Sequence, residues 1–183
     1  MEFKLKSISQ AGIGTAIAKA ERYRYLNEPE EAESICRDIL AVDPNHQLAK
    51  RILGLAITDQ FSGGVNDRVT EASSVFDSLE EQYAQLYYRG ILHERHAKAQ
   101  LSAGRPPQAV AAELEEAMRC FQGAEQRRPA GNDEAILRWN RCVRLLEQIP
   151  MPEPREEMQS FESGDTSPQF PARTTPLRAG RSR

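Results

Sequence analysis

The chain of 183 residues has no long apolar run, few cysteines and no large excess of either charge. A transmembrane helix needs about 20 predominantly apolar residues, and because the sequence contains no such stretch we expect no membrane span. The first residues, MEFKLKSISQAG, carry two lysines without an apolar block behind them, so a secretory signal is not expected. With 24 basic and 27 acidic residues, the net charge of −3 argues against a nucleic-acid partner.

The three cysteines, Cys36, Cys120 and Cys142, lie far apart in the sequence, and no pair has the spacing of a zinc knuckle or a redox motif. Each is surrounded by apolar residues in a predicted helix, where a free cysteine packs like a small hydrophobic side chain. We therefore expect buried, reduced thiols in a cytoplasmic protein that has no cofactor.

The sequence also lacks the two-residue alternation of a β-strand, and it shows a succession of helical segments instead. Proline and glycine turn signals separate seven expected helices, at about 9–26, 29–43, 46–60, 67–81, 83–102, 106–127 and 132–149. Asn27 and Asp67 are expected to cap the second and fourth helices, and Pro29 fits the first turn of the second.

Residues 151–183 differ from the rest, since they contain five of the eleven prolines and little that would form a core. A segment of low hydrophobicity with scattered prolines cannot offset the entropy lost on ordering. We therefore expect a helical domain over residues 1–150 and a disordered tail over 151–183.

A spacing of small and apolar residues recurs in the helical part. The offsets 0, +4, +7 and +12 are occupied by Ala32, Cys36, Ile39 and Pro44, by Ala117, Phe121, Ala124 and Pro129, and, without the proline, by Ala72, Phe76, Leu79 and Ala84. A small residue lies in the helix that precedes each set, at Ala20, Gly54 and Gly90.

This pattern resembles the tetratricopeptide repeat, a helix–turn–helix unit of 34 residues with a Leu-Gly pair, a later Ala, then Phe and Pro. The resemblance covers about residues 13–149, and the seventh helix stands where the family has a capping helix. It implies an all-α fold, a right-handed α-solenoid of antiparallel helix pairs. Small residues allow the paired helices to approach closely, so Ala20 and Ala32 are expected to face each other, and proline ends each pair.

The sequence departs from a strict repeat in two places. The second unit is stretched by about six residues at FSGGVN, and in the third unit Gly90 and Ala117 are 27 residues apart, whereas the strict pattern has twelve. We therefore expect the third helix pair to be longer than the others.

In proteins of this family the first helix of each pair lines a concave groove. Carried over by their offset from the small residue, the groove residues are Ile17, Glu21, Arg24, Tyr25, Leu48, Arg51, Leu55, Asp59, Tyr87, Ile91, Glu94 and Arg95, with Gly14, Thr58 and Ala84 at the remaining positions. Apolar residues between charged flanks suit an amphipathic helix or an extended peptide of a protein partner, with Tyr87 as an anchor. Ile17 and Glu21 replace the Lys and Asn of the carboxylate-clamp branch, so no such clamp is expected.

The resemblance implies a non-enzymatic scaffold for protein binding, and two other functions stay open. In ILHERH, His93 and His96 stand three residues apart with Glu94 between them, a set that a metal-dependent enzyme or accessory subunit would use. The zinc-protease pattern HExxH is absent, and our prediction contains no metal or catalytic residue. The third possibility is a structural module that self-associates, and the sequence does not determine the oligomeric state.

Overall fold

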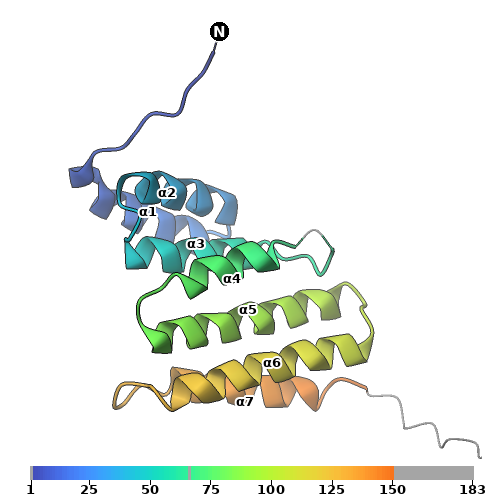
Figure 1. Cartoon of the computed structure of the whole chain (residues 1–183). Helices are drawn as coiled ribbons and strands as arrows, with labels where there is room; N and C mark the ends of the chain where they lie inside the picture. The colour runs from blue at the N-terminus through green and yellow to red at the C-terminus, as the bar shows by residue number, and fades with distance from the viewer. Residues whose placement is uncertain (1, 66, 151–183) are drawn as a thin grey trace, which may run out of the picture. The chain divides into compact units, whose positions relative to one another are not determined.

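The computed structural model describes residues 2–65 and 67–150, which contain seven α-helices and no β-strand. Figure 1 labels them in chain order, after a short 3₁₀ turn η1 (Gln10–Gly12): α1 (Ile13–Tyr25), α2 (Pro29–Val42), α3 (Gln47–Asp59), α4 (Val69–Asp77), α5 (Gln82–Ser102), α6 (Pro107–Glu125) and α7 (Glu134–Leu146). The prediction of an all-α protein is confirmed. The predicted disordered tail, 151–183, lies outside the described residues.

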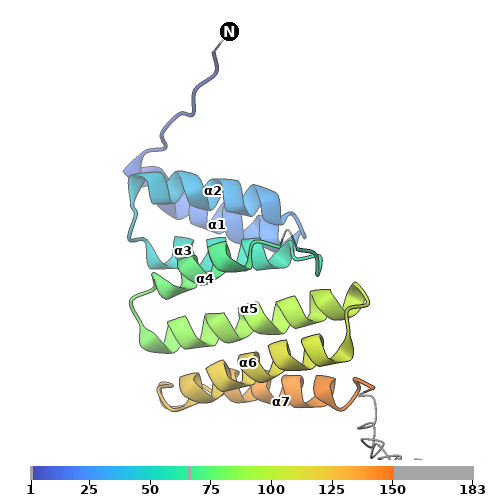
Figure 2. The same ribbon diagram turned by 45° about the vertical axis from the view of Figure 1, so that its right-hand side comes forward.

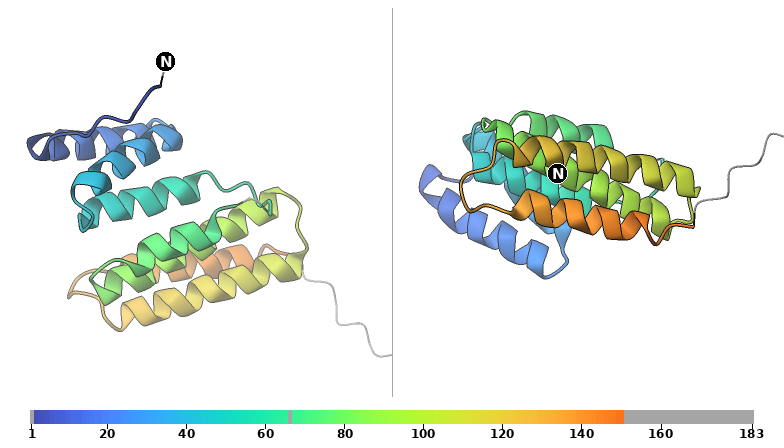
Figure 3. Two further views of the ribbon diagram at one scale, coloured as in Figure 1. Left: turned by 45° about the horizontal axis from the view of Figure 1, so that its top comes forward. Right: turned by 90° about the horizontal axis from the view of Figure 1, so that it is seen from below.

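Each helix packs mainly against the next helix in the sequence and runs in the opposite direction. Figure 1, Figure 2 and Figure 3 show α1 and α2 at one end of the row of helices and α6 and α7 at the other. The odd-numbered helices α1, α3, α5 and α7 also contact one another in order, which joins the helix pairs into one row. Of the helices in the described part of the chain, none combines the length and the low polarity that crossing a bilayer requires.

The turn between α1 and α2 differs from the prediction at Asn27. This residue has a positive φ of 60° and ends α1, while the residue before α2 is Glu28. The N–H of Glu28 donates a hydrogen bond to the carbonyl of Tyr23 at 2.9 Å, as in a Schellman motif. Asn27 therefore terminates α1 and does not cap α2, because asparagine tolerates the left-handed conformation that this turn needs. Pro29 begins α2, as predicted.

The fourth helix begins two residues later than predicted because Asp67 belongs to the loop before it. The Asp67 carboxylate accepts hydrogen bonds from the N–H of Ser62 at 2.9 Å, the hydroxyl of Ser62 at 3.0 Å and the N–H of Gly63 at 2.8 Å. Burial opposes the charge on Asp67, but these hydrogen bonds outweigh it and lower the pKa of the carboxyl group. Asp67 thus binds Ser62 and Gly63 at the start of the loop and does not cap α4, which begins at Val69.

The recurring positions predicted from the sequence are core positions. Ala20 is fully buried, and so are the three alanines Ala32, Ala72 and Ala117 that begin the recurring sets. The apolar residues that follow them are also buried, namely Cys36, Ile39, Phe76, Leu79, Phe121 and Ala124. All three thiols are free and buried, as expected, and burial raises the pKa of Cys36 and of Cys142 to about 12.

The close crossing within two pairs is between glycine and phenylalanine. A Cβ atom added to Gly54 would lie 2.3 Å from the ring of Phe76, and one added to Gly90 would lie 2.5 Å from the ring of Phe121. At these two crossings the small residue therefore lies against a phenylalanine ring of the second helix. The bulky ring one turn after the alanine fills the space that the missing side chain leaves.

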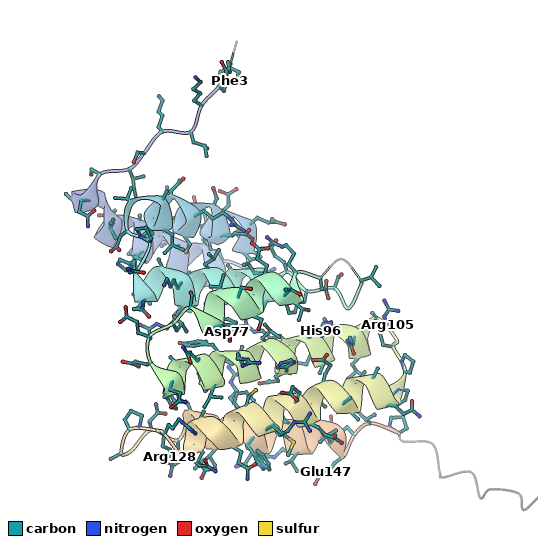
Figure 4. All side chains as sticks on the ribbon, in the orientation of Figure 1. Phe3, Asp77, His96, Arg105, Arg128 and Glu147 are labelled. Atoms are coloured by element: carbon teal, nitrogen blue, oxygen red, sulfur yellow. The ribbon has the colours of Figure 1, made fainter. Side chains whose placement is uncertain are left out.

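The third pair is longer than the second, as the spacing predicts. Helix α5 has 21 residues and α6 has 19, whereas α3 has 13 and α4 has 9. The loop between α3 and α4 contacts the turn after α5, since the guanidinium of Arg105 in that turn donates a hydrogen bond to the carbonyl of Gly63 at 3.0 Å. Figure 4 labels Arg105 in the turn after α5. The two segments that depart from the sequence pattern therefore contact each other.

Candidate binding groove

Three charged residues predicted for the groove meet across α1, α3 and α5. The Nε of Arg24 on α1 lies 2.8 Å from Oδ2 of Asp59 on α3, and Nη1 of Arg95 on α5 lies 2.7 Å from Oδ1 of the same carboxylate. We call Arg24, Asp59 and Arg95 the charge ladder. Arg24 and Asp59 are 35 residues apart in the sequence, and Asp59 and Arg95 are 36 apart. Since each of these pairs is in contact, the three side chains lie on one side of α1, α3 and α5, which we call the odd-helix face.

Arg95 is the best anchored member of the charge ladder. Besides Asp59, its guanidinium binds the hydroxyl of Thr58 at 2.6 Å and the carbonyl of Leu55 at 3.0 Å. Burial lowers the pKa of Arg95, and the charge of Asp59 opposes that effect by favouring the protonated form. An arginine held by three oxygens has little rotamer freedom left, so its side chain forms a rigid part of this face.

A pocket of about 330 Å³ lies beside the charge ladder. Its lining includes Thr58, Asp59 and Phe61 from α3 and the following loop, and Arg95, Lys98 and Ser102 from α5. An aromatic ring next to charged and hydroxyl groups suits a side chain that is partly apolar and partly polar.

Four residues predicted to be exposed in the groove are buried instead. Ile17 is 7% exposed, Tyr87 8%, Ile91 4% and Glu94 0%. Thr58 and Ala84 were also predicted to be exposed, but they are only 3% and 8% exposed. Tyr87 stacks on Tyr83 with ring centroids 5.7 Å apart and lies 6.0 Å from Phe121, so it belongs to the core of the last three helices.

Several predicted groove residues do retain access to solvent. Tyr25 at the end of α1 is 87% exposed, and Glu21 beside it is partly exposed. On α3, Leu48, Arg51 and Leu55 are half-buried. These residues and the charge ladder make up the part of the predicted groove that a ligand would reach.

Glu94 is fully buried in a cluster of opposite charges. Its carboxylate pairs with Lys98 one turn further along α5 and lies 3.3 Å from Nη1 of Arg138 on α7. Both cations are 39% exposed at their side chains, so they cover the carboxylate from the solvent side. Glu94 is thus part of the packing between α5 and α7 rather than a surface contact.

Sequence reasoning missed Lys98 and Arg138 on this face. Lys98 follows Glu94 by four residues, a helical spacing that predicts an ion pair between the two side chains. Arg138 lies on the predicted capping helix, where no groove position was assigned. It reaches Glu94 from 44 residues away, and no local pattern encodes that contact.

No family model, curated protein or solved structure matches this chain.

The metal set proposed as an alternative, His93, Glu94 and His96, is not assembled. Glu94 faces Lys98 and Arg138, whereas both histidines contact Glu113 of α6: Nδ1 of His93 lies 2.9 Å and Nδ1 of His96 lies 3.2 Å from its carboxylate oxygens. Successive residues on a helix point about 100° apart, which separates Glu94 from its neighbour His93. The hydrogen bond from His93 is the main cause that lowers the pKa of Glu113.

Proposed function

We propose that this protein is a non-enzymatic scaffold that binds a segment of a protein partner on the odd-helix face. In this proposal α1–α6 form three antiparallel pairs of a right-handed α-solenoid similar to tetratricopeptide repeats, α7 caps the last pair, and the protein works in the cytoplasm. The Gly54–Phe76 and Gly90–Phe121 crossings support the repeat, because the same contact occurs at equivalent positions in two pairs.

The charge ladder is the observation that carries the proposal. In a stack of helix pairs the first helices align, so residues at equivalent positions of successive units lie in a row. Tyr25, Asp59 and Arg95 each stand five residues after the small residue of their unit, and Arg24 stands four after it. The contact from Asp59 to Arg95 joins two equivalent positions, and the contact from Arg24 to Asp59 joins positions one residue apart in the repeat, which supports an aligned stack of first helices.

The chemistry of the odd-helix face favours a peptide of mixed character. Arg24, Arg95 and Lys98 are each paired with a carboxylate of this chain, so a polyanion would find no cluster of unpaired cations among them. The pocket next to Arg95 and the exposed ring of Tyr25 offer apolar contacts between polar groups. An amphipathic helix or an extended segment with an apolar anchor fits this surface.

A selection from a random peptide library on the purified full chain tests this proposal. We expect enriched peptides that share an apolar anchor, with a Kd that fluorescence anisotropy measures. Tyr25→Ala removes an exposed aromatic ring, and Ser102→Trp places a bulky side chain at the pocket. Each variant should weaken binding about fivefold or more, as the loss of a binding hot spot does.

The controls are Glu115→Ala and Glu115→Trp, two changes of the same kind at an exposed residue of α6. They should bind the selected peptides as the unmodified protein does. The proposal fails if no peptide is enriched, or if all four variants bind with the same Kd.

A further inference from the structure

Five side chains with metal-binding atoms gather between α5 and α6. His93 and His96 come from α5, one turn apart, and Glu113, Glu116 and Cys120 come from one face of α6 at spacings of three and four residues. Figure 4 labels His96 on α5. Residues three and four apart lie on the same side of a helix, so the two sets face each other across the pair.

The ligand atoms of three of these residues lie close together. The ligand atoms of His93, Glu116 and Cys120 lie within 4.8 Å of one another, and Cys120 is 6% exposed. Ligand atoms in a tetrahedral zinc site are roughly 3.5 Å apart, given bonds of about 2.0–2.3 Å. A side-chain rotation that moves these atoms together by about an ångström completes the set without moving the helices.

We propose that His93, Glu116 and Cys120 bind a divalent transition ion of the zinc class, with Glu113 as the residue that orients His93. A nitrogen, a thiolate sulfur and a carboxylate oxygen form a donor set that suits Zn²⁺, and a water molecule completes the tetrahedron. The ion links α5 to α6 at the middle of the longest helix pair.

Glu113 has the position of a supporting residue in such a site. It lies 2.9 Å from Nδ1 of His93, and a hydrogen on Nδ1 that is donated to the carboxylate leaves the lone pair of Nε2 free for the ion. The second histidine, His96, contacts the other oxygen of Glu113 at 3.2 Å and holds that carboxylate in place.

Two groups of the cluster change when an ion binds: the Glu116–Arg119 ion pair and the Cys120 thiol. Glu116 pairs with Arg119, whose side chain is 65% exposed, so this weak surface pair separates readily when a cation binds the carboxylate. Burial raises the pKa of the Cys120 thiol, and the charge of a bound ion compensates that of the thiolate. The proton of the thiol is released to the solvent on binding.

The site is separate from the proposed peptide groove. Glu94 and Arg95, which follow His93 on α5, contact α7 and α3, whereas His93 and His96 contact α6. Peptide binding and metal binding are therefore tested with different variants, and either proposal stands or falls alone.

Titration of the reduced, chelator-treated full chain with Co²⁺ tests the site, because cobalt replaces zinc and is visible by absorption. We expect one Co²⁺ per chain, a thiolate-to-cobalt charge-transfer band in the near ultraviolet and loss of that band when Zn²⁺ is added. The thermal unfolding midpoint should rise with the metal, since the ion binds the folded chain. Absence of the charge-transfer band overturns the proposal.

Substitutions identify the ligands. Cys120→Ala should abolish the charge-transfer band, whereas Cys36→Ala and Cys142→Ala, at two other buried thiols, should retain it. His93→Gln should weaken Co²⁺ binding at least tenfold, and His46→Gln, at the histidine before α3, should not. Glu113→Gln should weaken binding about 10–100-fold while the band keeps its position, as expected of a residue that supports a ligand.

His93→Gln also covers the case in which Cys120→Ala does not fold, because the His93 side chain is 20% exposed and its loss leaves the core intact. Far-ultraviolet circular dichroism monitors the helix content of each variant. The proposal is wrong if the band survives Cys120→Ala, or if His93→Gln binds Co²⁺ as tightly as the unmodified protein.

Discussion

The α3–α4 pair and the α5–α6 pair are built around the same contact but differ in length. Each pair crosses where a glycine meets a phenylalanine ring, Gly54 with Phe76 and Gly90 with Phe121. The glycine and the phenylalanine are 22 residues apart in the α3–α4 pair and 31 apart in the α5–α6 pair. The contact therefore fixes the point at which the two helices of a pair approach each other, whereas the helix lengths differ between the pairs.

The difference in length is compensated between the two pairs. The short α4 leaves room for the loop 60–68, which packs against the extra turns of α5. A Cβ atom on Gly63 in that loop would lie 2.4 Å from the carbonyl oxygen of Ala99, and Phe61 lies against His96 with ring centroids 5.7 Å apart. The difference in length between the two pairs is thus accommodated because the loop fills the space beside α5.

The largest expected effect is a loss of stability that differs between equivalent positions of α3 and α5. Tyr87 and Arg51 both stand three residues before the crossing glycine, but Tyr87 is buried and Arg51 is partly exposed. Tyr87→Ala should lower the free energy of unfolding by about 3 kcal/mol or more, because it leaves a cavity in an aromatic core. Arg51→Ala should cost less than about 1 kcal/mol. Urea denaturation measures both, and equal losses would contradict the assignment of Tyr87 to the core.

A second substitution tests the shared crossing. Gly54→Leu should cost about 1–3 kcal/mol, because the new side chain collides with the Phe76 ring. The double variant with Phe76→Ala should recover part of this loss, since the cavity accepts the leucine.

The control for this change is Gly14→Ala in α1, where an added Cβ atom meets nothing within 4 Å. It should raise stability by about 0.5–1 kcal/mol, the difference between glycine and alanine in a helix. An unchanged melting curve for Gly54→Leu would remove Gly54 from the crossing.

A third prediction concerns the ion pair between the loop before α4 and helix α2. Arg68, the residue before α4, binds the Glu33 carboxylate of α2 at 2.6 Å and 2.7 Å. The hydrogen bond from Arg68 is the main cause that lowers the pKa of Glu33 from 4.5 to about 2. Because the folded-state pKa is the lower one, this stabilisation is present above pH 4.5 and is lost as the pH falls from 4.5 towards 2.

Stability curves of the protein and of Glu33→Gln measure this pH dependence. Their difference in unfolding free energy should be on the order of 1 kcal/mol near pH 6, and it should shrink between pH 4.5 and 2. A constant difference over that pH range would show that the charge of Glu33 does not contribute.

The smallest expected effect is on the contact between the two irregular segments. Arg105→Ala removes the hydrogen bond to the Gly63 carbonyl and should cost about 0.5–1.5 kcal/mol. Hydrogen exchange should increase at the amide of Gly63, whose N–H is held by Asp67 in the same loop. Unchanged exchange at Gly63 would mean that the turn after α5 does not support this loop.

Much of the fold was predictable from local patterns. Helical periodicity together with proline and glycine placed all seven helices, and the recurring small and apolar residues proved to be core positions. The errors at Asn27 and Asp67 have one cause. Both residue types cap helices, but both also stabilise turns, and the sequence alone does not show which partner they have.

The candidate site was predicted only in part. The offsets placed Arg24, Asp59 and Arg95 on one predicted groove surface, but they did not predict that Asp59 pairs with both arginines. Exposure did not follow from those offsets: Tyr87 and Glu94 are covered by residues that lie far away in the sequence. A position on a helix fixes the direction of a side chain, whereas its burial depends on what packs there.

The sequence by itself determined the helices, their order and the glycines at which they cross, since these depend on periodicity over a few residues and on side-chain size. Only the tertiary structure decided which charges pair and which residues surround the histidines. Glu94 meets Arg138 from 44 residues away, and His93 meets Glu113 from 20 residues away. Such contacts depend on the lengths and rotations of whole helices, which the long α5–α6 pair and the loop 60–68 set together.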